Sequence, residues 1–261
     1  MRIPLAIALA PALLLAPAAR ADEGKVDWEH KVVKCTGSGA ANLKDADGNP
    51  AVARIGAEKA ARLDALRNCL ATLRGVQLES GRTVGSALES DAALSGRVQG
   101  LVRGFRTVGK PRYFSDGGVE MDVEVPLEGA LSEALLPHQP SGAAEPAAAP
   151  AGGPTSLVVD ARGQKLTPAL APRVRDDAGR EVYGPEKLND VGRRAGGAAA
   201  YAPDLDSARR SMGDRMGERP LLVKAVRVEG SDVVISAADA ALLGGPVPAF
   251  LAQGKVVILT D

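Results

Sequence analysis

The chain has 261 residues, with 32 basic and 32 acidic side chains, two Cys, two His and only seven aromatic residues. This balanced charge excludes the strongly basic surface that non-specific nucleic-acid binding requires, and we expect no nucleic-acid partner. Two His and two Cys are too few to form a four-ligand metal cage without suitably spaced carboxylates. Hydrophobic residues make up 45% of the chain, as in globular proteins. Because aromatic residues are scarce, we expect a core built from Ala, Val and Leu.

The first 21 residues have the features of a cleaved export signal. Arg2 precedes an apolar run over residues 3–17, and Ala19 and Ala21 supply the small residues that signal peptidase accepts. The run contains three prolines and is shorter than the roughly 20 residues that a membrane span requires. We therefore expect cleavage between Ala21 and Asp22. Because the first residue after that site is Asp22 and not Cys, we expect a periplasmic mature protein without a lipid anchor or a membrane span.

A segment of unusual composition divides the mature chain. Residues 137–154 contain five Pro, six Ala and three Gly, a composition that does not bury a core and is typical of linkers. The segment separates residues 22–136 from residues 155–261, and each part has a common domain size. We expect an α+β protein made of two small mixed α/β domains. The first is expected to be a short antiparallel sheet with one long packed helix.

The N-terminal domain is predicted to contain a strand, a long helix, a second helix, a hairpin and a closing helix. The long helix has the clearest boundaries, because Asn49 is a typical N-cap, Pro50 suits the first helical position and Gly75 ends the helix. The other expected elements are a strand over 28–36 that ends at Gly37-Ser38-Gly39, a helix over 86–102, strands over 105–114 and 119–127 around a turn at 115–118, and a helix over 127–136.

Apolar residues recur along the long helix at spacings of three and four, which predicts one buried face. They are Ala53, Ala57, Ala60, Leu63, Leu66, Leu70 and Leu73. A helix of about 25 residues is roughly 37 Å long, enough to cross a whole sheet.

The hairpin carries charges of opposite sign on its two strands. The acids of the second strand are Glu120, Asp122 and Glu124, and the bases at or before the first strand are Arg103, Arg106, Lys110 and Arg112. These groups can pair across the ladder. We expect a solvated face with ion pairs worth less than about 1 kcal/mol each, and a recognition surface is the alternative.

Several segments of residues 28–136 carry a resemblance to a known family. They are ARIGAEKAARLDALRNCL from Ala53, Gly75-Val76, Thr83-Val84, VRGFRTV from Val102 and DGGVEMDVEVPL from Asp116. The combination is similar to the domain shared by the N-terminal region of flagellar assembly protein T and a family of small bacterial envelope lipoproteins. The resemblance implies a small α/β envelope module that acts by contact rather than by chemistry.

The C-terminal domain is predicted to mix short strands with short helices. The expected elements are a strand over 156–161, a hairpin of 173–175 and 180–184, short helices within 185–220 that include one capped by Asp204, a hairpin of 221–228 and 232–235, a helix from Ser236 to Leu243, and a last strand over 255–259. This domain is similar to the second half of uncharacterised secreted proteins that carry the domain named above.

The two cysteines are the first candidates for a special role. Cys35 lies on the first expected strand and Cys69 on the long helix. They either form a disulfide or remain two buried thiols, and we favour the disulfide because export leads to an oxidising compartment. The bridge would close a loop of about 34 residues and stabilise the fold by roughly 3–4 kcal/mol on the chain-entropy model.

The histidines and acidic clusters do not form a recognisable catalytic or metal-binding motif. His30 has no G-x-S-x-G nucleophile motif to work with, and His138 falls in the linker. Asp45-x-Asp47-x-Asn49 begins like a calcium loop, but Pro50 and Gly56 stand where that motif needs Gly and Glu. We interpret it as a polar loop before a capped helix.

The remaining charged pairs favour structural roles. Asp176-Asp177 precedes Gly179 and is typical of a turn. Arg193-Arg194 and Arg209-Arg210 lie among acidic residues, which indicates a solvated surface of mixed charge. We therefore expect no catalytic, cofactor-binding or metal-binding residues and no cofactor.

Two hypotheses for function remain. The first is a non-catalytic periplasmic protein that serves the cell envelope as a structural or protein-interaction module, with an envelope protein as its partner. The second is a periplasmic hydrolase or small-ligand-binding protein with a site between the domains. A deep pocket with converging carboxylates would favour the second, and an exposed sheet edge or apolar patch would favour the first.

Overall fold

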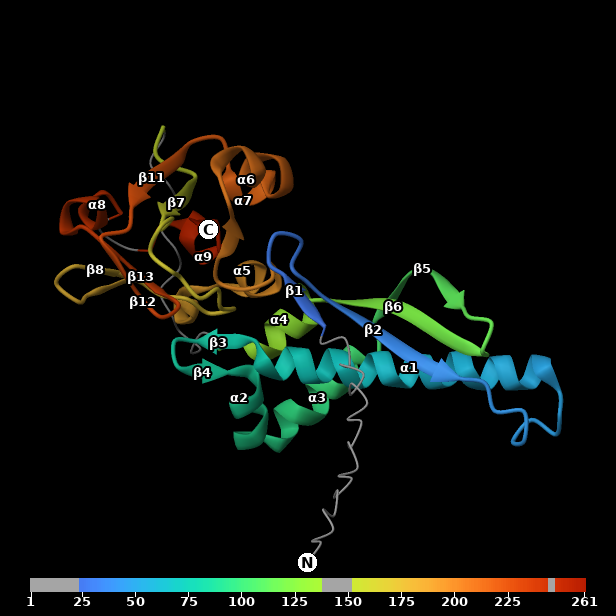
Figure 1. Ribbon diagram of the computed structural model, residues 1–261. Coiled ribbons are helices and arrows are strands. Elements are labelled where there is room, and N and C mark those ends of the chain that lie inside the picture. The colour runs from blue at the N-terminus through green and yellow to red at the C-terminus, as the bar shows by residue number, and fades with distance from the viewer. Residues whose placement is uncertain (1–23, 138–151, 244–246) are drawn as a thin grey trace, which may run out of the picture.

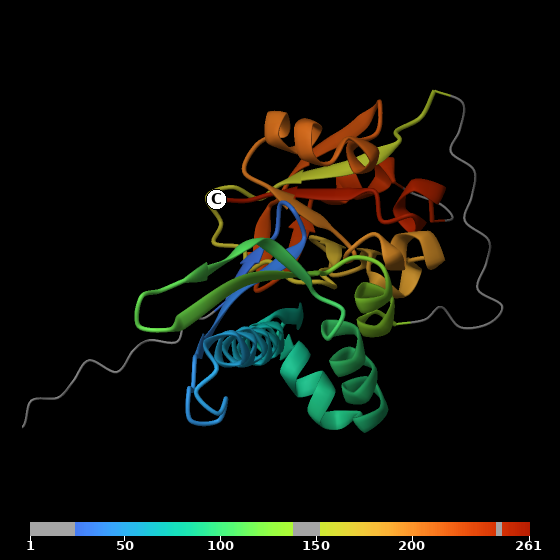
Figure 2. The same cartoon turned by 90° about the vertical axis from the view of Figure 1, so that its right-hand side faces the viewer.

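The computed structural model describes residues 24–137, 152–243 and 247–261, so the expected signal peptide, the Ala21–Asp22 cleavage site and most of the expected linker lie outside the described residues. The chain forms two α/β halves that pack side by side (Figures 1 and 2). The N-terminal half is an antiparallel sheet in the order β1-β2-β6-β5 with the long helix α1 against it. This arrangement confirms the expected α+β class and the long helix packed on a short sheet.

The elements of the N-terminal half follow one another closely. They are β1 (Lys25–Asp27), β2 (Val32–Ala40), α1 (Pro50–Gly75), β3 (Gln77–Glu79), β4 (Arg82–Thr83), α2 (Val84–Ser90), α3 (Ala92–Val102), β5 (Arg106–Tyr113), β6 (Gly118–Pro126) and α4 (Ala130–Leu135). Asn49 caps α1 as expected, because its side chain accepts from the backbone amides of Ala51 and Val52.

The first strand differs from the expectation at both ends. Residues 28–31 form a tight turn between β1 and β2, and β2 continues through Gly37 and Gly39 to Ala40. A Cβ atom on Gly37 would lie 2.1 Å from the backbone nitrogen of Ala65 in α1, and one on Gly39 would lie 2.2 Å from the carbonyl oxygen of Ala57. The two glycines therefore allow β2 to contact the backbone of α1. They do not end the strand, as the sequence had suggested.

The buried face of α1 is also rotated from the expected one. Ala60 and Leu63 are exposed, and Leu66 and Leu70 are half-buried. The buried residues are Ala53, Ala57, Ala61, Ala65, Cys69 and Leu73. Because the glycines of β2 bring the two backbones so close, only small side chains fit along most of the contact.

The helix expected over 86–102 is two helices. Asp91 separates α2 from α3 in an extended conformation, and its carboxylate accepts from the backbone amide of Leu94. An aspartate side chain competes in this way for backbone donors, which ends one helix and begins the next.

The hairpin β5–β6 pairs its charges as the sequence indicates. Arg106 lies opposite Glu124 and Arg112 lies opposite Glu120. The guanidinium of Arg106 is 2.7 Å from Glu124, and Arg112 contacts both Glu120 and Asp122.

The C-terminal half contains two small sheets. A parallel sheet has the order β10-β14-β7-β11, and a mixed sheet has the order β12-β13-β8-β9. The strands are β7 (Ser156–Asp160), β8 (Val174–Asp176), β9 (Glu181–Tyr183), β10 (Ala200–Ala202), β11 (Pro220–Lys224), β12 (Arg227–Glu229), β13 (Asp232–Ile235) and β14 (Val256–Leu259). The helices are η1 (Pro185–Lys187), α5 (Asp190–Arg194), α6 (Leu205–Ser211), α7 (Gly213–Met216), α8 (Ala237–Leu242) and α9 (Ala249–Ala252).

One predicted strand of this half divides between the two sheets. The strand expected over 221–228 becomes β11, which pairs with β7, and β12, which pairs with β13. The chain crosses from one sheet to the other at Ala225 and Val226, whose amides donate to Asp160 and Val234. Asp204 and Ser236 cap α6 and α8 as expected. Across the described ranges, we find no helix whose length and apolar character would carry it through a membrane.

Candidate functional site

The two halves are joined through their backbones. The amides of Leu170 and Ala171 donate to the carbonyl oxygens of Gln77 and Leu78 at 3.0 and 2.7 Å. Gln77 also forms a parallel bridge with Ala169. The β3–β4 hairpin of the N-terminal half is thereby attached directly to the C-terminal half.

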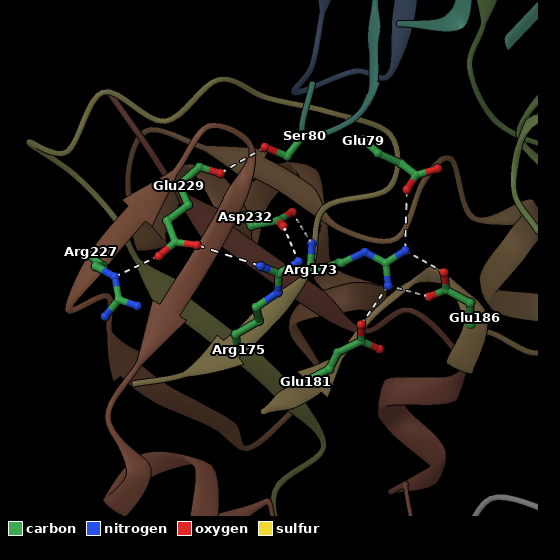
Figure 3. Close-up of polar contacts among 9 residues, drawn as sticks. All are labelled: Glu79, Ser80, Arg173, Arg175, Glu181, Glu186, Arg227, Glu229 and Asp232. Atoms are coloured by element: carbon green, nitrogen blue, oxygen red, sulfur yellow. Dashed lines mark hydrogen bonds and ion pairs between the residues drawn. The ribbon is translucent and has the colours of Figure 1, made fainter. Parts of the chain in front are cut away.

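An ion cluster around Arg173 strengthens this contact (Figure 3). The guanidinium lies 2.5 Å from Glu186, 2.7 Å from Glu181 and 3.4 Å from Glu79, which comes from the β3–β4 hairpin. The hydrogen bonds that Arg173 donates to Glu186 and Glu181 raise the pKa of its guanidinium against the effect of burial. Arg173 thus links three carboxylates, and one of them belongs to the other half.

We expect Arg173→Gln to lower the free energy of unfolding by about 1–3 kcal/mol at pH 7, because three carboxylates lose their shared cation. Urea denaturation measures the change. Arg227→Gln is the matched control, since Arg227 and its partner Glu229 are both exposed, and its loss should stay within about 0.5 kcal/mol. Equal effects of the two variants would contradict the role assigned to Arg173.

A second contact forms around α4 and α5. The buried hydroxyl of Ser132 donates to the carbonyl oxygen of Arg193 at 2.5 Å and accepts from the amide of Gly197 at 3.0 Å. Arg194 pairs with Glu133 at 2.9 Å. Arg193 is only 3% exposed and pairs with Asp190. The expectation of a solvated surface is therefore wrong for Arg193, which is buried in the contact between the halves, whereas Arg194 is exposed and pairs with an acid as expected.

The second arginine pair lies on a mixed surface as the sequence indicates. Arg209 is 3.8 Å from Asp206, and Arg210 donates to the hydroxyl of Ser207 at 3.0 Å.

The two cysteines form a disulfide, as expected. Cys35 on β2 is bonded to Cys69 on α1, and their Cα atoms are 5.6 Å apart. Both residues are buried. The bond therefore fastens α1 to the strand that carries Gly37 and Gly39.

His30 lies in the β1–β2 turn. Its Nδ1 is 3.0 Å from both carboxylate oxygens of Asp27, and its backbone amide donates to the same group at 2.9 Å. Burial opposes ionisation of Asp27, but the hydrogen bonds from Lys34 and His30 hold the pKa of this carboxyl well below its usual range. The contacts between His30 and Asp27 stabilise the β1–β2 turn.

The acidic clusters named from the sequence also serve local structure. Asp45 accepts from the side chain of Asn42 at 2.7 Å in the loop before α1. Asp176 is buried, and its carboxylate accepts from the backbone amide and the Nε of Arg180 at 2.8 and 2.7 Å. Over the three described ranges, no group of three or more His, Cys, Asp and Glu is placed to hold a metal ion.

Exposed apolar side chains gather at one end of the N-terminal half, and we call this surface the distal tip. Its members are Leu43, Tyr113 and Phe114, which line one groove and are each between 48% and 53% exposed. They come from the loop before the start of α1, the end of β5 and the β5–β6 turn. Figure 1 shows this end of α1 extending away from the C-terminal half.

The distal tip contains a groove, and contacts with α1 fix one of its side chains. A groove of about 370 Å³ runs between Pro50, Leu43 and Phe114. The guanidinium of Arg54 lies 4.5 Å from the ring centre of Tyr113, and the Tyr113 hydroxyl donates to Glu58 at 2.9 Å. Both contacts come from α1 and fix the aromatic ring in position. Sequence reasoning missed this surface, although the adjacent aromatic residues at the hairpin turn were a signal for it.

The exposed edge of the sheet is less suited to binding than the distal tip. Edge strand β5 is interrupted between Val108 and Arg112. Gly109 has a φ of 70°, and Lys110 and Pro111 follow it. A bulge, a lysine and a proline are the features that protect edge strands from pairing with another chain.

The comparisons with known proteins concern the C-terminal half. Residues 156–261 match the family model of the second domain of Tp0624 from Treponema pallidum. The match begins at the first residue of β7, so it supports a separate C-terminal domain. No curated protein sequence matches the chain.

Proposed function

We propose that the chain is a non-catalytic protein-interaction module of the bacterial cell envelope that works in the periplasm, and that the distal tip is its docking surface. The observation that carries the proposal is the cluster of half-exposed apolar side chains at the tip. Single exposed apolar residues are common on monomers, but clusters that include aromatic residues are typical of protein interfaces.

The geometry of the distal tip favours a protein partner with a projecting apolar side chain. The groove offers a cavity of about 370 Å³, which suits one or two inserted side chains. Tyr113 is already held by Arg54 and Glu58, so little side-chain entropy is lost when a partner binds. The charged groups beside the groove then form a polar rim around an apolar centre.

The envelope location rests on the sequence and on the disulfide. The first 21 residues have the pattern of an export signal. The Cys35–Cys69 bond is of a kind that persists in oxidising compartments such as the periplasm.

The hydrolase alternative gains no support from the carboxyl groups. A general acid needs a raised pKa. Burial raises the pKa of the Asp232 carboxyl. Its carboxylate accepts from the backbone amide of Arg173 and lies 3.3 Å from Arg175 (Figure 3), which is a structural arrangement.

Site-specific photocrosslinking in intact cells tests the proposal. We expect a photoreactive residue at Leu43 or Phe114 to yield a discrete crosslinked protein. Val191 and Leu242 are matched control positions, because they are exposed apolar residues outside the tip, at 63% and 64%. Crosslinks from the controls alone, or from none of the four positions, would refute the distal tip as a docking surface.

The same partner allows a quantitative check. We expect the double variant Leu43→Ser/Phe114→Ser to weaken binding at least tenfold, because apolar anchors dominate interface energies. The free energy of unfolding should change by less than about 0.5 kcal/mol, since both side chains are half-exposed. Unchanged affinity would assign the partner to another surface.

A further inference from the structure

A cavity of about 510 Å³ lies where the two halves meet, away from the distal tip. It is bordered by the β1–β2 turn, by Glu128 before α4 and by the segment from Arg210 to Arg215. The volume falls within the range of small-molecule sites.

Arg215 lines this cavity and is only 6% exposed. Its Nη2 donates to the carbonyl oxygens of Ala195 and Gly197. Its Nε and Nη1 are buried and have no hydrogen-bond partner among the described residues. A buried guanidinium with two unsatisfied nitrogens is costly, so a further acceptor at this position would stabilise it.

A second cation converges on the same point. The Nζ of Lys31, with its side chain 11% exposed, donates to the carbonyl oxygen of Ala195 at 2.7 Å. Burial and the charge of Arg215 lower the pKa of Lys31 to about 8. The carboxylate of Glu128 is 3.3 Å away but 54% exposed. Two buried cations therefore share one carbonyl oxygen and one exposed carboxylate.

The turn over residues 195–197, whose carbonyl oxygens accept from Lys31 and Arg215, is closely packed. Gly196, between Ala195 and Gly197, has a φ of 84°. A Cβ atom on Gly196 would lie 2.7 Å from Lys31 Cδ and from Glu128 Cγ. Lys31 thus packs directly on the turn, and its ammonium group is positioned before any ligand arrives.

The other acids of the cavity are more open to solvent than the cations. Asp214 is exposed, and Glu29 is half-buried and accepts from the hydroxyl of Ser211 at 2.7 Å. The buried wall is therefore cationic, and the exposed rim carries these acids together with Arg210. The cationic wall leaves room for one small anionic group.

We infer that this cavity binds a small molecule through a carboxylate or phosphate group that contacts Arg215 and Lys31. The inference is independent of the docking function of the distal tip. Binding involves no covalent step. It adds an anionic acceptor beside two buried cations that share one carbonyl oxygen and one exposed carboxylate.

Calorimetric titration of the mature chain tests the inference. Inorganic phosphate and propionate are used as separate probes at pH 7 and low ionic strength. We expect one of them to bind saturably at one site, and we expect Lys31→Met to weaken that binding at least fivefold. Arg209→Met is the matched control and should bind as the unmodified chain does, because Arg209 is exposed and does not line the cavity.

Nuclear magnetic resonance of ¹⁵N-arginine-labelled protein tests the contact with Arg215 directly. It needs no substitution at this buried residue, which could prevent folding. The Arg215 Nε–H signal should shift along the same saturation curve as the calorimetric binding. The inference is overturned if neither probe saturates, if Lys31→Met binds like the unmodified chain, or if the Arg215 signal does not move. The probe that binds also decides between carboxylate and phosphate chemistry.

Discussion

Gly37→Ala is expected to lower the free energy of unfolding by about 3 kcal/mol, as in strongly overpacked cores. The added methyl group would lie 2.1 Å from the backbone nitrogen of Ala65 and 2.2 Å from the carbonyl oxygen of Ala61. Neither atom can move unless α1 moves away from the sheet. Urea denaturation measures the loss, and the circular dichroism of the folded variant shows whether α1 remains helical.

Gly56→Ala is the matched control, because it adds the same methyl group to α1, the helix that Gly37 contacts. Gly56 lies inside α1 on its exposed side, and a Cβ atom there meets nothing within 4 Å. Alanine favours helix over glycine, so we expect this variant to be more stable by about 0.5–1 kcal/mol. Opposite signs at the two positions are the expected result. A neutral Gly37→Ala variant would mean that β2 and α1 are not in backbone contact.

Reduction of the Cys35–Cys69 bond is expected to lower the free energy of unfolding by about 3–4 kcal/mol on the chain-entropy model. The bond joins residues 34 positions apart and therefore restricts a long loop in the unfolded chain. Denaturation curves with and without reductant measure the loss.

The double variant Cys35→Ala/Cys69→Ala provides the control for reduction. Its stability should be close to that of the reduced protein and should not respond to reductant. A denaturation midpoint that reductant leaves unchanged in the unmodified chain would refute a stabilising role for the bond.

Local signals in the sequence predicted much of the N-terminal half. Asn49 and Pro50 define the start of α1 because capping depends on neighbouring residues alone. The alternating residues of β6 likewise predicted the hairpin. Gly37 and Gly39 misled the prediction, because the property that matters is how closely α1 approaches, and α1 lies later in the chain.

Long-range pairing explains what the sequence left open in the C-terminal half. The division of residues 221–228 between two sheets depends on β7 and β13, which lie elsewhere in the chain. The candidate sites have the same origin. Arg215 and Lys31 are 184 positions apart and meet only because the halves pack together, so no local motif marks them.

The placement of α1 has a mechanical consequence. At about 1.5 Å per residue, its 26 residues form a rod of roughly 39 Å. The Cys35–Cys69 disulfide links α1 covalently to the sheet. The C-terminal end of α1 leads into the β3–β4 hairpin, which is hydrogen-bonded to the C-terminal half. A protein bound at the far end would therefore be kept at a constant distance from the C-terminal half, a distance that the length of α1 sets.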